Sequence, residues 1–447
     1  MNALIQGKLL NPLLLKSFSE HFGFKSLTPS QGKALPLLLG NLKKDIVLRA
    51  PTGSGKTLSY ILSSAELNLR SPSKGVGTLI VVPRRELAHQ VAKEARGAMK
   101  FSPESRVCCL APGSSRSEDI SDLVNNQPEV VVGTIARLSE HVRSTMGFRN
   151  LFKDVNSIVF DEVDELVEKS HESEISSLMT CLPPKSRRRT ILVSATISED
   201  VKRLGASLIK PDYLYIDCSS TEVSHIQQSF VIVPGSLLFS SLINAINLEI
   251  SSRPFAHKIL VFFPTCKSAE LASKLCAEFF PVTILTGQSE ADERERASRN
   301  FRNSTNGIMF TTDVSSRGVD YENISLVIQF LTPSSHDIYM HRIGRTGRGG
   351  RTGRALLIIH HKERAFLRRV DKVVESEISS AFFCHKNISS WEHDSTLGLL
   401  AEEAHLSLIS YFRGVSGLLG IGQSDAISIA NDFVTSAGLT EPPKYSL

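Results

Sequence analysis

The residues best suited to chemistry lie in the string A-P-T-G-S-G-K-T, residues 50–57, between an apolar strand-like run and a helix-like run. Gly53 and Gly55 let successive backbone N–H groups turn inward around phosphate oxygens, and the following helix directs its positive end to the same place. Lys56 adds a positive charge for the terminal phosphates, and the Thr57 hydroxyl is a magnesium ligand. The string therefore predicts a nucleotide-phosphate loop. The alternative is an ordinary glycine-rich turn that matches this specific string, between a strand and a helix, by chance.

Two carboxylates follow another apolar run. Residues 157–160 are typical of a buried strand, and D-E-V-D comes directly after them, beginning with Asp161 and Glu162. Asp161 can hold a hydrated magnesium ion, and Glu162 can orient and deprotonate an attacking water. D-E-x-D alone is a common surface turn. Behind a strand, and after a phosphate loop, it predicts the acidic turn of a magnesium-ATP hydrolase.

A second group of charged residues is basic. H-R-I-G-R-T-G-R spans residues 341–348, and its glycines let guanidinium groups approach another surface closely. On its own such a turn is usually a solvated face. Because the segment with the phosphate loop has no obvious arginine to neutralise transition-state charge, we expect Arg345 and Arg348 to act as arginine fingers across a cleft.

Two further positions have alternative interpretations. Ser194 and Thr196, in T-I-L-V-S-A-T, can hydrogen-bond the acidic turn and report the state of the γ-phosphate, or Thr196 or Ser198 is only a helix N-cap. Gln31 stands third in a helix that Thr28 is expected to cap, so its amide either completes a capping box or pairs with an adenine edge. The local sequence leaves both pairs of alternatives open.

These groups need a sheet to position them. Strand-like runs alternate with helix-like segments at residues 78–82, 106–110, 130–133, 157–160 and 190–196, and again at residues 229–233, 258–263, 282–285, 307–310 and 325–330. The alternation predicts an α/β fold with parallel sheets covered by helices, and ligands at the carboxyl ends of the strands. Polar residues at 210–212 and 219–222 indicate a boundary between two such series.

Composition sets the outer limits. Hydrophobic residues make up 41% and charged residues 22%, as in an ordinary globular enzyme. The net charge of +5 permits nucleic-acid binding but does not establish it. Seven cysteines, without C-x-x-C spacing, indicate a reducing compartment and no structural zinc. No apolar run has membrane-spanning length. The first residues resemble neither a secretory signal nor an arginine-rich presequence.

Over about residues 20–360 these motifs resemble the DEAD-box RNA helicases of superfamily 2. The resemblance implies two tandem RecA-like lobes, residues 1–220 and 226–362, that close on ATP, Mg²⁺ and RNA. It places the nucleotide on Phe24, Gln31, Pro51, Thr52, Gly53, Ser54, Gly55, Lys56, Thr57 and Asp320. It implies metal binding by Thr57 and Asp161, and coupling between nucleotide and RNA by Asp164, Ser194, Thr196 and His341.

The resemblance also implies RNA contacts. They fall on Arg85, Gly113, Thr134, Arg137, Thr265, Gly287, Arg294, Thr312 and Arg317. These groups are expected to grip phosphates and 2′-hydroxyls without reading bases, so that binding is sequence-independent and salt-sensitive. The sequence departs from the family pattern at T-I-A-R-L, residues 134–138, where T-P-G-R-L is usual, and at Arg84, which replaces a threonine and is expected to add a phosphate contact. ATPase chemistry should survive these changes, while the efficiency of strand separation is open.

Residues 363–447 form a predicted helical C-terminal extension, with a basic helix over residues 361–374 and another helix over residues 399–419. The final stretch resembles the extension of fungal mitochondrial DEAD-box proteins that act as RNA chaperones in intron splicing. Such an extension lengthens the RNA track and bends a departing strand, or alternatively it only steadies the second lobe.

We therefore predict a monomeric, RNA-stimulated ATPase that unwinds short RNA duplexes or remodels RNA–protein particles, with organellar splicing or ribosome assembly as its setting. An ATP-gated RNA clamp with little unwinding is the first alternative, and release of a duplex strand separates the two. A translocating DNA helicase is disfavoured by Gln31 and D-E-V-D, and a comparison of RNA with DNA stimulation tests it. The extension favours a mitochondrial location, with the nucleus and cytoplasm still open.

Overall fold

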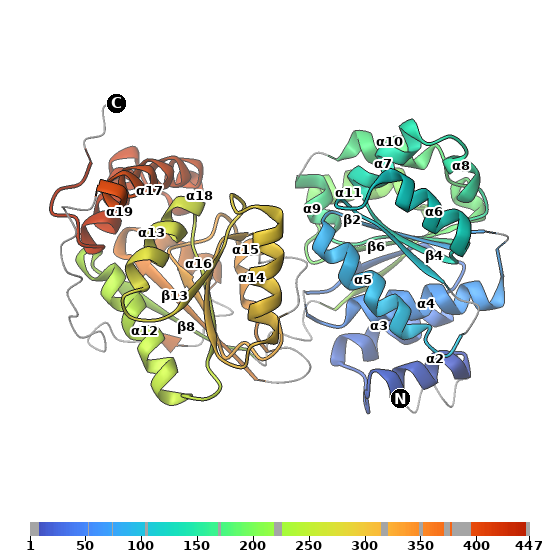
Figure 1. Cartoon of the computed structure of the whole chain (residues 1–447), viewed down its shortest axis with the longest axis horizontal. Coiled ribbons are helices and arrows are strands. Elements are labelled where there is room, and N and C mark those ends of the chain that lie inside the picture. Colours follow the sequence, from blue (N-terminus) through green and yellow to red (C-terminus); the bar gives the residue numbers. More distant parts are fainter. Residues whose placement is uncertain are drawn as a thin grey trace. The chain divides into compact units, whose positions relative to one another are not determined.

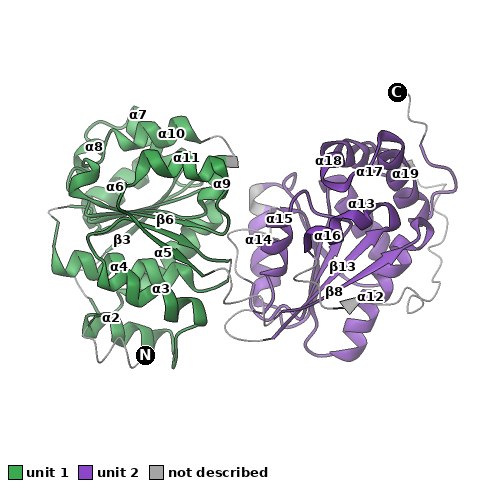
Figure 2. Cartoon of the chain, turned by 180° about the vertical axis from the view of Figure 1, so that it is seen from behind, with its two compact units in different colours: residues 1–222 green, residues 223–447 purple. Residues whose placement is uncertain are grey.

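The computed structural model describes residues 9–51, 53–73, 75–102, 106–168, 171–218, 226–313, 321–347, 352–370, 376–377 and 395–443. The chain divides into two compact units, residues 1–222 and 223–447 (Figure 2). Each unit is built on one seven-stranded parallel sheet. We call the units lobe 1 and lobe 2, and the predicted α/β class with two parallel-sheet lobes is confirmed.

The sheet of lobe 1 has the strand order β3-β4-β2-β5-β6-β1-β7. Its strands are β1 Ile46–Arg49, β2 Thr78–Val82, β3 Val107–Leu110, β4 Val130–Thr134, β5 Ser157–Phe160, β6 Arg189–Ser194 and β7 Leu214–Asp217. The central strands are apolar and fully buried on both faces, as expected when helices cover a parallel sheet. The strand β7 follows residues 210–212 and pairs with β1, so it belongs to lobe 1, and the division between the two units falls after residue 222, at the end of the second polar run.

Helices cover both faces of this sheet (Figure 1). One face packs against α3 Pro29–Gly40, α4 Lys56–Arg70 and α5 Arg85–Ala98, with the short α2 Pro12–Lys16 beyond them. The other face carries α6 Arg116–Asn126, α7 Ile135–Ser144, α8 Phe148–Leu151, α9 Val163–Glu168, α10 Glu172–Met179 and α11 Glu199–Leu208. Each face has its own apolar core, so the sheet is held rigidly from both sides.

The sheet of lobe 2 has the order β10-β11-β9-β12-β13-β8-β14. Its strands are β8 Ile226–Val233, β9 Lys258–Phe262, β10 Val282–Leu285, β11 Gly307–Thr311, β12 Leu326–Phe330, β13 Gly353–His360 and β14 Ser376–Glu377. Its helices are α12 Leu238–Ser252, α13 Cys266–Cys276, α14 Ala291–Asn303, α15 His336–Ile343, α16 Leu367–Val370, α17 Ser395–Gly414, α18 Ser416–Leu419 and α19 Gln423–Ser436. The predicted strands of both lobes are present, whereas β7, β13 and β14 are additional.

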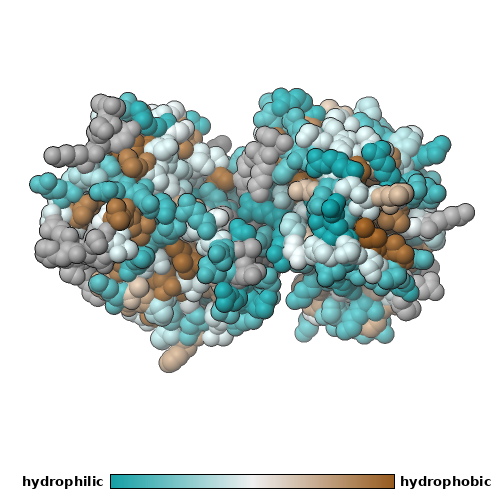
Figure 3. All heavy atoms as spheres, turned by 45° about the horizontal axis from the view of Figure 1, so that its top comes forward, coloured by the Kyte–Doolittle hydropathy of each residue, from teal (hydrophilic) through white to brown (hydrophobic). Residues whose placement is uncertain are grey.

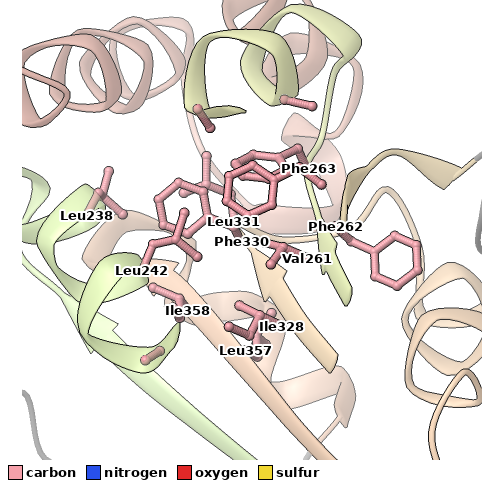
Figure 4. Packing of buried hydrophobic residues seen from close by; sticks show 14 of the residues in the cluster. Leu238, Leu242, Val261, Phe262, Phe263, Ile328, Phe330, Leu331, Leu357 and Ile358 are labelled. Carbon is pink, nitrogen blue, oxygen red and sulfur yellow. The ribbon is translucent and has the colours of Figure 1, made fainter. Parts of the chain in front are cut away.

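The C-terminal helices share the core of lobe 2. The Phe433 ring of α19 lies 5.1 Å from the Phe239 ring and 6.1 Å from the Phe330 ring, measured between centroids. Figure 4 shows Phe330 in this core, beside Phe263 and Leu331. The predicted helix over residues 399–419 is present as α17 and α18, whereas residues 361–366 of the predicted basic helix form a 3-10 turn. Residues 371–374 of that prediction lie outside the described residues.

The visible face in Figure 3 has both polar and apolar areas. Figure 3 shows hydrophobic residues on the visible face as separate areas between hydrophilic ones. Single exposed apolar side chains such as Met146 and Phe255 are ordinary on the surface of globular proteins. In the part of the chain that the structure describes, no helix combines the length and the apolar character that crossing a membrane requires.

Candidate active site

The predicted phosphate loop joins the carboxyl end of β1 to α4. Gly53 and Gly55 have φ angles of 81° and 77°, a left-handed region that favours glycine. A Cβ added at Gly55 would lie 2.5 Å from Nε2 of Gln31, so the position also has no room for a side chain. The Ser54 hydroxyl is buried and has no hydrogen-bond partner among the described residues. A tight backbone cradle with an unsatisfied buried donor fits a phosphate group.

Gln31 contacts this loop while it caps a helix. Thr28 Oγ1 accepts from the Gln31 N–H at 3.2 Å, and the Thr28 N–H donates to Gln31 Oε1 at 3.0 Å, which completes the capping box. The Gln31 Nε2 also donates to the Gly55 carbonyl at 3.3 Å. The capping alternative therefore holds in this structure, and the adenine contact stays a prediction. Phe24, 42% exposed, stacks on Phe22 with ring centroids 5.6 Å apart.

The acidic turn leads from β5 into α9. Asp161 is buried, and its Oδ2 accepts from the Tyr60 hydroxyl at 2.8 Å. Its Oδ1 accepts from the Glu162 N–H at 2.9 Å and lies 3.6 Å from Lys56 Nζ. The phosphate-loop lysine and the predicted metal ligand are thus neighbours. Tyr60 was missed by the sequence interpretation, although its place one helical turn after Lys56 is a usable signal.

Glu162 has the features of a reactive carboxylate. Its backbone φ of 50° lies in the left-handed region, which is costly for a residue with a side chain. The side chain is buried, and within the described ranges its Oε2 has no hydrogen-bond partner. Burial raises the pKa of Glu162 to about 7, against the opposing influence of Lys56. A general base with a pKa near the working pH is effective in abstracting a proton from water.

The S-A-T segment contacts the acidic turn. Thr196 Oγ1 donates to Asp164 Oδ2 at 3.3 Å, and Ser194 Oγ donates to the Thr196 carbonyl at 2.6 Å. Ser198 is the N-cap of α11 and accepts from the Val201 N–H at 3.3 Å. Of the two alternatives for Thr196, contact with the acidic turn is therefore the one present.

Arg84 forms an ion pair that the sequence did not predict. Its guanidinium pairs with the buried Glu165 and ties the start of α5 to α9, and the phosphate contact stays a prediction. Thr57, in the first turn of α4, and Asp161 are the residues that fit a hydrated magnesium ion. Within the described ranges there is no cluster of three or more His, Cys, Asp or Glu side chains that could hold a metal ion.

In lobe 1, Arg85 and Gly113 lie together. Gly113 has a φ of 112°, and a Cβ there would lie 2.6 Å from Cζ of Arg85. Thr134 is the N-cap of α7 and accepts from the Arg137 N–H at 3.4 Å. The fold therefore brings the first pair of predicted RNA contacts into direct proximity and places Thr134 at a helix N-terminus.

Arg137 makes contacts within lobe 1. Its guanidinium donates to Asp119 Oδ2, to Glu140 Oε2 and to the Ser114 carbonyl, each at 2.8 Å, and the side chain is buried. Asp119 also accepts from Ser114 Oγ at 2.6 Å and lies 2.9 Å from Nε2 of His141. These hydrogen bonds tie the loop after Gly113 to α7, and the RNA contact of Arg137 stays a prediction.

In lobe 2, the predicted RNA contacts Thr265, Gly287 and Thr312 follow the neighbouring strands β9, β10 and β11. Arg294 lies in the first turn of α14 and is half-buried. Thr265 is the N-cap of α13, and its hydroxyl lies 2.9 Å from that of Ser407 in α17. These residues meet at one edge of the sheet, which a C-terminal helix also reaches.

The basic motif lies in and after α15. His341 and Arg345 are buried, and Arg345 Nε donates to the His341 carbonyl at 3.2 Å. Arg342, which the sequence interpretation missed, donates from Nε to Asp313 Oδ1 at 2.7 Å and anchors α15 to the end of β11. Four predicted site residues lie outside the described residues: Thr52, Arg317, Asp320 and Arg348.

Comparisons with known proteins agree with this geometry. Residues 28–204 match the model of the DEAD/DEAH box helicases, and residues 238–350 match that of the helicase conserved C-terminal domain. DEAD-box ATP-dependent RNA helicase 26 of Oryza sativa subsp. japonica is 30% identical over 444 residues, 97% of this chain and 81% of the relative. DEAD-box ATP-dependent RNA helicase 25 of Arabidopsis thaliana is 30% identical over 452 residues, 97% and 78% of the two chains. The chain therefore belongs to the DEAD-box ATP-dependent RNA helicases.

Solved structures give the same fold. The DEAD-box helicase Mss116, bound to single-stranded RNA and UDP-BeF, is similar with a TM-score of 0.84 and 23% identity over 98% of this chain and 91% of that one. S. cerevisiae Dbp5, bound to RNA and ADP BeF3, is similar with a TM-score of 0.69 and 23% identity over 88% and 98%. The predicted RecA-like lobes, family and enzyme class are thus confirmed, with ATP and RNA as the ligands of the class.

Proposed function

We propose that the protein is an RNA-stimulated ATPase that grips single-stranded RNA without reading its bases and separates short RNA duplexes. Glu162 carries the proposal. It is a buried carboxylate beside the phosphate loop, its pKa is raised to about 7, and within the described ranges its Oε2 lacks a hydrogen-bond partner. Such a group is suited to receive a proton from an attacking water.

The other residues of lobe 1 orient the reaction. Backbone N–H groups of the glycine turns and Lys56 would bind phosphate oxygens, and Asp161 and Thr57 would hold Mg²⁺, which supplies charge neutralisation on the phosphates. Tyr60 and the Glu162 N–H fix the Asp161 carboxylate by hydrogen bonds of 2.8 and 2.9 Å. Arg345 and Arg348 of lobe 2 are proposed to stabilise transition-state charge.

RNA would be held along its backbone. Arg85 against Gly113 in lobe 1, and Thr265 and Thr312 in lobe 2, offer a guanidinium, hydroxyls and backbone N–H groups. Groups of these kinds contact phosphates and 2′-hydroxyls, so affinity should be independent of sequence and should fall with salt. The solved structures of Mss116 and Dbp5 in complex with RNA support this part of the proposal.

We further propose that the setting is remodelling of organellar RNA, in intron splicing or ribosome assembly, by a monomer in the mitochondrion. The support is the similarity to Mss116, which extends over 98% of this chain and thus includes the C-terminal helices. Localisation of a tagged full-length chain, and capture of RNA by cross-linking in the cell, test the setting independently of the chemistry.

Steady-state ATP hydrolysis tests the activity itself. The intact chain, Glu162→Gln and the matched control Glu199→Gln, which changes an exposed carboxylate, are measured with single-stranded RNA, with DNA and with neither. We expect RNA-specific stimulation that Glu162→Gln abolishes and Glu199→Gln retains. Equal turnover with and without RNA would overturn the RNA-coupled mechanism. Stimulation without release of a short duplex would favour the ATP-gated clamp.

A further inference from the structure

The turn between β12 and α15 has an unusual backbone. Leu331 has a φ of 67°, in the left-handed region, and its side chain is fully buried. Figure 4 shows Leu331 in the lobe 2 core beside Phe330. A leucine in this region is unfavourable unless surrounding structure holds it there. The turn therefore depends on its neighbours for its conformation.

Two elements hold the residue that follows. Glu363 Oε1 accepts from the Thr332 N–H at 2.8 Å and from the Thr332 hydroxyl at 2.6 Å, while its Oε2 accepts from the His360 N–H at 2.8 Å. On the other side, the Tyr411 hydroxyl of α17 donates to the Thr332 carbonyl at 2.8 Å. Glu363 is buried, so its hydrogen bonds do not compete with water. Both backbone polar groups of Thr332 are thus fixed, one of them by the C-terminal helix.

The same turn is the start of the helix with the basic motif. Ser335, three residues after Thr332, caps α15 by accepting a hydrogen bond from the Ile338 N–H at 3.1 Å. Phe366, from the 3-10 turn that contains Glu363, packs edge-on against Tyr339 of α15 with ring centroids 6.1 Å apart. A shift of the Thr332 carbonyl would therefore be transmitted to α15 at its first turn.

The helix α17 is itself anchored to the edge of the sheet. Ser407 Oγ lies 2.9 Å from Thr265 Oγ1, and Glu403 pairs with Lys267 at 2.9 Å, so α17 is bound to the start of α13. Both contacts lie N-terminal to Tyr411 in α17. The helix thus bridges the first turn of α13, with its predicted RNA contact, and the turn that begins α15.

We propose that Tyr411 is a positioning residue for ATP hydrolysis. By holding the Thr332 carbonyl, it fixes the start of α15 and through it the orientation of His341 and Arg345. The C-terminal helices then take part in the ATPase cycle, in addition to any contact with RNA. The inference rests on the proposed role of α15 in hydrolysis, and its test includes a measurement that does not require activity.

The experiment removes single polar groups around Thr332. Tyr411→Phe deletes one hydroxyl and keeps the ring, and Tyr213→Phe, at an exposed tyrosine of lobe 1, is its matched control. Thr332→Val deletes the hydroxyl that donates to Glu363, whereas Thr332→Ser keeps it. For each variant we measure kcat and KM for ATP at saturating single-stranded RNA, RNA affinity, thermal unfolding, and amide hydrogen exchange over residues 331–343.

We expect Tyr411→Phe and Thr332→Val to lower kcat about two- to tenfold, the equivalent of one lost hydrogen bond. KM and RNA affinity should stay close to those of the parent, and the melting temperature should fall by no more than about 2–4 °C. Exchange should accelerate over residues 331–343 and not elsewhere in lobe 2. Thr332→Ser and Tyr213→Phe should behave like the parent. The contrast between each variant and its control then shows that the hydrogen bonds of Thr332 and Tyr411 matter for kcat.

Three outcomes overturn the inference. The first is a kcat and exchange pattern for Tyr411→Phe equal to those of Tyr213→Phe. The second is faster exchange throughout lobe 2 with a larger fall in melting temperature than one hydrogen bond explains, and the third is a loss of RNA affinity alone. The second would make α17 only a packing helix, and the third would place Tyr411 in RNA binding. If the parent shows no RNA-stimulated hydrolysis, the proposed function fails, and local exchange over residues 331–343 then decides the inference by itself.

Discussion

Glu162 in lobe 1 and Glu363 in lobe 2 are both buried glutamates, and burial raises the pKa of each to about 7. Their surroundings differ. Glu363 accepts three hydrogen bonds from Thr332 and His360, whereas Glu162 Oε2 has no partner within the described ranges, on a backbone in the left-handed region. A raised pKa alone therefore shows that a glutamate is buried, and it does not identify a catalytic group. An incomplete set of partners on a strained backbone is what distinguishes the candidate catalytic group.

The largest effect should come from Glu162→Gln, which separates chemistry from stability. We expect kcat for RNA-stimulated ATP hydrolysis to fall by about 10²- to 10⁴-fold, the usual contribution of a general base. The free energy of unfolding should stay the same or rise, because the substitution removes a buried ionisable group that lacks a partner at Oε2. Single-turnover hydrolysis and urea denaturation measure the two quantities. A parent-like kcat with lowered stability would mean that Glu162, like Glu363, stabilises the fold and does not take part in catalysis.

Arg137→Ala extends the comparison to a buried cation with a full set of partners. Removing the guanidinium leaves the buried Asp119 with fewer donors, so we expect a loss of about 3–5 kcal/mol in lobe 1 stability. The matched control is Arg116→Ala, in the same network but about half-exposed, with an expected loss below about 1 kcal/mol. Urea denaturation measures both. Weaker RNA binding by Arg137→Ala at unchanged stability would mean that Arg137 contacts RNA and does not stabilise lobe 1.

The sequence was sufficient for the parts of the site that are contiguous. The phosphate loop and D-E-V-D each lie behind one strand, so their glycines, lysine and carboxylates predict their own geometry. The motif of Arg137 predicts an RNA contact but not its ion pair, because its partner Asp119 lies 18 residues away and the packing of α6 against α7 brings the two together. A buried ion pair of this kind leaves no local pattern in the sequence.

The fold was predictable to a similar degree. Alternation of strands and helices predicts the two parallel sheets, but it does not predict β13, an apolar run that follows the more conspicuous basic motif. The predicted basic helix over residues 361–374 failed at its start for a physical reason. His360 and Glu363 form a capping box that closes a 3-10 turn, and Glu363 is drawn inward to Thr332. Helical spacing of surface charges does not reveal this inward hydrogen bond.

A smaller effect is expected from Glu363→Gln. The amide nitrogen can only donate, so it would face either the His360 N–H or the Thr332 donors and leave at least one buried donor without an acceptor. We expect a loss of about 1–3 kcal/mol in lobe 2 stability at pH 8, measured by urea denaturation. Glu162→Gln creates no such clash and is the matched control. Equal stability of the two variants would mean that the hydrogen bonds of Glu363 contribute nothing.

The pH dependence of stability gives the finest test. The folded-state pKa of Glu162, about 7, exceeds the value of an unfolded glutamate, so between these two pH values the folded chain keeps a proton that the unfolded chain has lost. The contribution of Glu162 to stability should therefore fall by about 2 kcal/mol as pH rises from 5.5 to 7 and then level off, and Glu363, whose pKa is raised to the same value, should add a fall of similar size. Glu162→Gln removes this contribution, so the difference in unfolding free energy between variant and parent should grow over the same interval. A constant difference would show that Glu162 is ionised in the folded protein, and it would then enter the cycle already deprotonated and need no proton loss before it activates water.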